Sequence, residues 1–227
     1  MMTRVVRLFS SALCFISALA LHASSHIPRR GPQKAGGPDV AISATAITVT
    51  HGTPGATIYF ASVSIFSAGD FLVNVERPGG SAVADASGNA TFTPPKGVRT
   101  RSVWLIVDGE SGGYTVASPP VMLLREMDLP GNASAGANGA LRKVTSNRYS
   151  TDLFLIRAGS GMWVARIIDG GTGDDDHVTN GRVSTDISVL TPFAGASAEV
   201  PDKFAKGDIL FFVDRNTLEF AVASQGN

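Results

Sequence analysis

The densest group of potential metal ligands lies in residues 169–182, where an apolar run ends abruptly in glycines and aspartates. Calcium takes about six to eight oxygen ligands from a loop that bends around it, usually with glycine at the sharpest turn. The segment supplies both, and its candidate metal ligands are Asp169, Asp174, Asp176 and Asn180. An EF-hand register that starts at Asp176 fails, because Val178 and Ile187 would occupy ligand positions. Two interpretations therefore stay open: a calcium-type site, or a solvated hairpin loop.

His177 follows three aspartates in the same loop, and this neighbourhood invites an enzymatic interpretation. A secreted hydrolase could use the acidic loop 169–182 together with His177. A transition-metal site would need a second histidine at ligand spacing, and none follows. The nearest approach to a nucleophile turn, residues 157–162, lies between two strand-like runs rather than between a strand and a helix. No catalytic residue is therefore assigned, and a loop histidine without a chemical role is the other interpretation.

The first 23 residues have the pattern of a secretory signal peptide. Arg4 and Arg7 precede an apolar run from Leu8 to Leu21, and small residues at 18–20 suit signal-peptidase cleavage. The run is shorter than the roughly 20 residues of a membrane-spanning helix. We therefore expect a secreted, periplasmic or cell-surface protein with no membrane span after cleavage. Residues 24–38, rich in proline, glycine and basic side chains, are expected to form a flexible leader.

Cysteine content and charge narrow the possible chemistry. Cys14, the only cysteine, lies inside the predicted signal peptide, so the mature chain is expected to have no disulfide, thiolate metal site or cysteine nucleophile. The formal net charge is zero, and the chain has no basic stripe of the kind that nucleic-acid binding needs. These features suit a bacterial exported protein stabilised by its hydrophobic cores alone, and they argue against a nucleic-acid partner.

The elements that must position any site are strands. Between residues 39 and 127, about seven short strand-like runs alternate with turn residues, which favours a β-sandwich of immunoglobulin type. Residues 102–107 are apolar on both faces, as in a central strand that is covered on both sides. Trp104 is expected in the core of this sandwich. Gly88 and its neighbours at 86–89 predict a tight hairpin between the flanking strands.

Two segments of this half carry a family resemblance. Thr53-Pro54-Gly55-Ala56-Thr57-Ile58 and the run from Val83 to Pro95 (VADASGNATFTPP) resemble the two recurring phrases of bacterial immunoglobulin-like modules. The resemblance implies a cell-surface or secreted module with a spacer or adhesive role and no catalytic residues to carry over. This chain holds a single copy, with Ala90-Thr91 where the family often has a tryptophan.

A second β-rich unit is expected after a linker at 128–140, which consists mostly of glycine, alanine, asparagine and serine. Strand-like runs lie at 152–157, 162–168, 182–190, 209–213 and 218–222. Turn residues at 158–161 and 214–217 predict two hairpins among them. The predicted fold is therefore all-β: an immunoglobulin-like β-sandwich over 39–127, followed by a smaller β-rich domain over 141–227.

These patterns predict a secreted or cell-surface, non-enzymatic binding or structural protein, with Ca²⁺ as the candidate stabilising ligand of the acidic loop. Its partner would be an extracellular protein or a glycan whose identity the sequence does not reveal. The alternative is the secreted hydrolase that uses residues 169–182 and His177.

Overall fold

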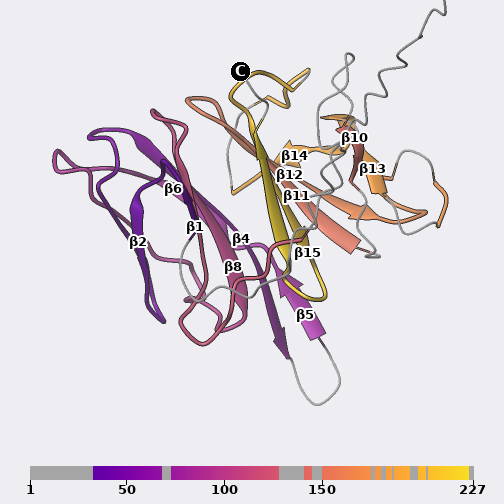
Figure 1. Cartoon of the computed structure of the whole chain (residues 1–227), viewed down its shortest axis with the longest axis horizontal. Coiled ribbons are helices and arrows are strands. Elements are labelled where there is room, and N and C mark those ends of the chain that lie inside the picture. Colours follow the sequence, from indigo (N-terminus) through magenta and orange to yellow (C-terminus); the bar gives the residue numbers. More distant parts are fainter. Residues whose placement is uncertain are drawn as a thin grey trace, which may run out of the picture.

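A computed structural model of the chain shows a protein built almost entirely of strands (Figure 1). It describes residues 33–67, 73–127, 141–144, 150–174, 177–179, 183–185, 187–194, 199–202 and 204–224. The predicted signal peptide, 1–23, and the predicted linker, 128–140, lie outside these residues. Within them the single helical element is a short 3-10 turn, Ile187–Val189, and no helix is long and apolar enough to cross a membrane. The all-β class predicted from the sequence is confirmed.

The N-terminal part of the described chain forms two antiparallel sheets. The six-stranded sheet has the order β1 (Gln33–Ala35), β9 (Tyr114–Ala117), β8 (Ser102–Asp108), β4 (Thr57–Ser67), β5 (Val73–Glu76), with β6 (Gly79–Val83) also paired to β4. The three-stranded sheet has the order β2 (Asp39–Ile42), β3 (Ile47–Thr50), β7 (Ala90–Phe92). Its three strands form a separate layer beside the larger sheet.

The C-terminal part forms a five-stranded sheet and a short two-stranded one. The five-stranded order is β14 (Thr191–Pro192), β12 (Gly161–Ile168), β11 (Ser150–Arg157), β15 (Ile209–Asp214), β16 (Phe220–Ser224). The two-stranded sheet pairs β10 (Leu141–Val144) with β13 (Val183–Thr185). Both hairpins predicted here are confirmed: β11 pairs with β12 and β15 pairs with β16 through short turns. The strand predicted over 182–190 is shorter than expected, because β13 gives way to the 3-10 turn.

The six-stranded sheet is the middle layer of the molecule (Figure 1). One face packs on the three-stranded sheet around Phe60 and Trp104, and the other packs on the five-stranded sheet around Leu105, Phe154 and Phe211. Because β8 is covered on both sides, every residue of this strand is buried. The central strand and the core tryptophan predicted from the sequence are both confirmed.

The five-stranded sheet also buries apolar side chains on both of its faces. Its face toward the six-stranded sheet contributes Phe154 and Phe211 to the shared cluster, which we call the inter-sheet core. Its other face packs Leu153, Trp163 and Phe212 into a separate cluster. Successive strand residues point to opposite faces, so the nearly continuous apolar runs of β11, β12 and β15 supply both clusters. The inter-sheet core therefore joins side chains from before and after the predicted linker.

Two local expectations differ from the structure. The leader predicted to be flexible over 24–38 is ordered from Gln33 onward, because β1 forms the edge of the sheet and pairs with β9 through backbone hydrogen bonds that need no apolar pattern. The turn around Gly88 is present, with the backbone N–H of Asp85 donating to Asn89 O over 2.8 Å. It does not close a hairpin, since β6 pairs with β4 while β7 pairs with β3. The turn therefore carries the chain from one sheet to the next.

Candidate functional site

The acidic loop begins as a tight turn at the end of β12. Asp174 Oδ2 accepts a hydrogen bond from the backbone N–H of Gly170 over 2.8 Å, and both Asp169 and Asp174 are buried. Gly170 and Gly173 take left-handed backbone angles, with φ of 69° and 79°. These features fold two of the four predicted metal ligands into one turn, in which the carboxylate of Asp174 already holds the backbone.

The other two predicted ligands, Asp176 and Asn180, lie outside the described residues. Among the residues that are described, no group of three or more His, Cys, Asp or Glu side chains is placed to hold a metal ion. His177 is exposed and has a positive φ of 53°. The calcium site therefore stays a prediction. The described part of this loop does not place His177 beside other residues that could form a catalytic site with it, so the hydrolase interpretation stays a prediction as well.

A buried charge cluster that the sequence analysis missed lies at the end of the inter-sheet core. Asp152 in β11 is 0% exposed, with Oδ1 at 3.3 Å from Arg77 Nε and Oδ2 at 3.4 Å from Arg215 Nε. Arg166 is the cross-strand neighbour of Asp152 on β12. Burial raises the pKa of Asp152, while the positive charges of Arg77, Arg215 and Arg166 act to lower it. The alternation of the strand could have revealed this cluster. Asp152 lies two and four residues before Phe154 and Ile156, which face the inter-sheet core, so Asp152 is expected on the same face.

This cluster links the two large sheets. Arg77 directly follows β5 of the six-stranded sheet, Asp152 lies in the five-stranded sheet, and Arg215 belongs to the turn between β15 and β16. Burial also lowers the pKa of Arg215, and the nearby charges of Arg166 and Arg77 add to this effect while Asp152 opposes it. A single buried carboxylate thus holds guanidinium groups from different layers close together.

A groove opens where the chain crosses from one sheet to the other, and we call it the inter-sheet groove. It has a volume of about 550 Å³. Three segments far apart in the sequence line it: the residues before β8, the crossover after β9, and the β15–β16 turn. The lining residues are Thr100, Arg101, Val121, Met122, Leu123, Arg125, Asn216, Thr217 and Leu218.

The chemistry of the groove is cationic and apolar. Arg101 and Arg125 are exposed, and neither side chain forms a hydrogen bond or ion pair with any residue that the structure describes. Val121 is 78% exposed and Leu123 is 38% exposed. No carboxylate side chain is among the lining residues. An anion could therefore pair with the guanidinium groups, while an apolar part of the same ligand covers the aliphatic side chains.

Hydrogen bonds hold both walls of the groove in place. In the crossover, Ser118 Oγ donates to Met122 O over 2.9 Å, and the N–H of Phe220 in β16 donates to Arg125 O over 3.0 Å. In the β15–β16 turn, Asp214 Oδ1 accepts from the N–H of Asn216 over 2.8 Å and from the N–H of Thr217 over 2.7 Å. The groove is thus bounded by ordered backbone on both sides.

In two other pockets of the described chain, the lining cations already have partners. In a pocket of about 290 Å³, Glu76 accepts from Lys96 Nζ over 2.7 Å and from Arg99 Nη2 over 3.3 Å. In a pocket of about 470 Å³, Arg157 Nε and Nη2 each donate to Asp208 over 2.8 Å. The hydrogen bond from Lys96 is the main cause that lowers the pKa of Glu76. Among these pockets, the inter-sheet groove therefore differs in having arginines that pair with no residue in the described part of the chain.

Comparisons with protein-family models, with curated proteins and with solved structures give no match to this chain.

Proposed function

We propose that this chain is an exported, non-enzymatic binding protein of the cell surface or extracellular space, and that the inter-sheet groove holds its ligand. The observation that carries the proposal is the pair of exposed arginines, Arg101 and Arg125, whose side chains have no partner among the residues that the structure describes, beside exposed Val121 and Leu123. The volume of about 550 Å³ lies within the range of roughly 300–1,000 Å³ that is usual for small-ligand sites. Export is proposed from the signal-peptide pattern of residues 1–23.

The construction of the groove supports a binding role. Hydrogen bonds to the backbone hold its walls, so little backbone order has to be gained when a ligand enters, and less free energy is lost on binding. The resemblance to bacterial immunoglobulin-like modules supports a surface role without catalysis. Calcium remains the ligand that we predict for Asp169, Asp174, Asp176 and Asn180, where it would stabilise the fold rather than take part in turnover.

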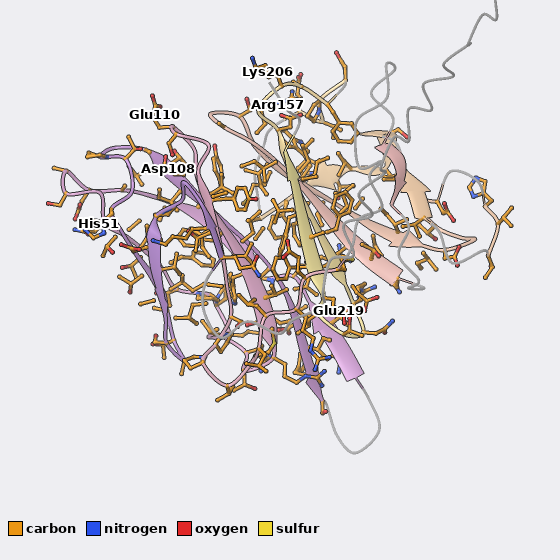
Figure 2. All side chains as sticks on the ribbon, viewed as in Figure 1. His51, Asp108, Glu110, Arg157, Lys206 and Glu219 are labelled. Carbon is orange, nitrogen blue, oxygen red and sulfur yellow. The ribbon has the colours of Figure 1, made fainter. Side chains whose placement is uncertain are left out.

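A fluorescence titration tests the proposed site. The ligand is 8-anilinonaphthalene-1-sulfonate, which joins an anionic sulfonate to an aromatic body and fluoresces on leaving water. The double variant Arg101→Gln/Arg125→Gln is expected to bind it at least tenfold more weakly than the wild type. Lys206→Gln is the matched control, because Lys206 lies beyond one end of β15, whereas Glu219, the residue that follows Leu218 of the groove, lies beyond the other end (Figure 2). Equal affinity of the double variant and the wild type would refute the groove as the binding site.

The non-enzymatic part of the proposal needs its own assay. p-Nitrophenyl acetate and p-nitrophenyl glycosides are incubated with the wild type and with His177→Gln. We expect both proteins to give the rate of buffer alone. A turnover that the wild type shows and His177→Gln lacks would favour the hydrolase instead.

A further inference from the structure

The charged groups of the inter-sheet groove have one sign and come from two distant segments. Arg101 precedes β8 at the end of the six-stranded sheet, whereas Arg125 lies in the crossover, where its carbonyl accepts from Phe220 of β16. Tertiary folding therefore places both arginines in the lining of one groove. An anionic head group in this groove could accept hydrogen bonds from the guanidinium N–H groups, which have no partner among the described residues.

The apolar side of the groove is continuous with the inter-sheet core. Leu218 lines the groove and belongs to that core, and the partly buried Met122 packs against it. Val121 and Leu123 line the same groove and are exposed to solvent. Methionine is unbranched and flexible, so Met122 can adapt to a chain that lies along this surface. The groove thus offers a cationic part next to an apolar part that reaches the core.

The lining also argues against other anions. Nucleic-acid bases stack on aromatic side chains, and no aromatic residue is among those that line the groove. A short inorganic anion or a sulfated polysaccharide would pair with Arg101 and Arg125 but would leave Val121 and Leu123 exposed. A ligand that satisfies both parts has an anionic head and an apolar tail.

We infer that the inter-sheet groove binds a single anionic amphiphile, with a carboxylate or sulfate head between Arg101 and Arg125 and an unbranched apolar chain along Val121, Leu123 and Met122. This inference rests on the proposed function, because it specifies the ligand class of the same groove. The ligand is a free monomer in water rather than a lipid within a bilayer, because the groove would enclose one chain.

Isothermal titration with matched ligands tests the inference. Laurate, below its micellar concentration, is compared with dodecyltrimethylammonium, which has a chain of similar length and the opposite charge, and with octanoate, which has a shorter chain. We expect laurate to bind one per chain and at least tenfold more tightly than dodecyltrimethylammonium. Octanoate should bind more weakly than laurate, by about fourfold for each CH₂ group that loses its burial.

Two double variants separate the contributions of head and tail. Arg101→Gln/Arg125→Gln should remove the preference for laurate over dodecyltrimethylammonium. Val121→Ser/Leu123→Ser should reduce the dependence on chain length while it keeps the preference for the anion. Lys206→Gln should bind laurate as the wild type does. All of these substitutions are at exposed positions, and an unchanged circular-dichroism melting curve confirms that each variant is folded.

Three outcomes would overturn the inference. Equal binding of laurate and dodecyltrimethylammonium would refute the anionic head. Binding only to phosphatidylglycerol vesicles and not to laurate would indicate a membrane surface, and binding only to heparin would indicate a sulfated polymer. If Arg101→Gln/Arg125→Gln still weakens 8-anilinonaphthalene-1-sulfonate binding in any of these cases, the groove is retained as the binding site and only the ligand class is wrong. If that variant has no effect, the proposed function fails as well.

Discussion

Replacing Arg215 with methionine tests whether the buried carboxylate of Asp152 depends on its partner in the β15–β16 turn. The substitution removes the guanidinium group and keeps an unbranched apolar side chain. Arg215 is 12% exposed, Asp152 is 0% exposed, and Arg77 would remain at 3.3 Å as the other close partner. Breaking a buried ion pair costs about 3–5 kcal/mol, and we expect ~3 kcal/mol at neutral pH because Arg77 remains. This corresponds to a fall in melting temperature of roughly 6–12 °C for a chain of this size.

The effect of Arg215→Met should depend on pH with a defined sign. Burial already raises the pKa of Asp152, and Arg215 is one of the groups that lower it, so the variant raises this pKa further. Between the unfolded and the folded pKa, the native state binds more protons than the unfolded state, and stability therefore increases as the pH falls. The loss caused by Arg215→Met is thus fully present above the raised folded pKa and shrinks as the pH falls through it.

Urea unfolding at pH 5 and pH 8, followed by tryptophan fluorescence, measures both effects. Arg166→Met is the matched control, because Arg166 is exposed and, unlike Arg77 and Arg215, forms no ion pair with Asp152. It should destabilise the protein much less than Arg215→Met. The double variant Asp152→Asn/Arg215→Met should recover most of the stability, because it removes the uncompensated charge. An equal loss at both pH values, or a double variant that shows the full sum of the single losses, would refute the reasoning.

Three further predictions concern the fold and the acidic loop. Gly55→Ala should lower the free energy of unfolding, measured in urea, by about 1 kcal/mol because residue 55 has a left-handed backbone conformation. Gly88→Ala should lower it by about 2 kcal/mol more. Both glycines have a φ of 77°, but only a Cβ at 88 would clash with backbone, that of Gly52; equal losses would contradict this reasoning. Calcium at a hundredfold excess over its dissociation constant should stabilise the wild type by about 2.7 kcal/mol, and Asp174→Asn much less. Melting curves that do not respond to calcium would exclude this site. In each single-tryptophan variant, Trp104→Phe and Trp163→Phe, the fluorescence of the remaining tryptophan and the circular dichroism should give the same urea midpoint, because the inter-sheet core joins both halves; separate midpoints within one variant would indicate independent units.

Local patterns in the sequence predict much of the secondary structure. The apolar run of 102–107 indicates a strand covered on both faces, and glycine-containing or polar turn residues at 158–161 and 214–217 indicate hairpins; the structure confirms all three. Each of these depends on neighbouring residues, through alternation and turn geometry. The pairing of β6 with β4 and of β7 with β3 was not predictable in the same way. It depends on segments that are far apart in the chain.

The candidate sites show the same division. The acidic loop is recognisable in the sequence because its carboxylates are consecutive. In the sequence Asp152 is only a polar residue at the start of an apolar strand, and its burial depends on the six-stranded sheet that packs over it. The inter-sheet groove has no sequence motif, since Arg101, Arg125 and Leu218 come from three separate segments. The sequence by itself determined the strands, their turns and the apolar faces, because these are set by short-range geometry. Only the packing of one sheet on another decided which charges are buried together and which arginines line the inter-sheet groove without a partner among the described residues.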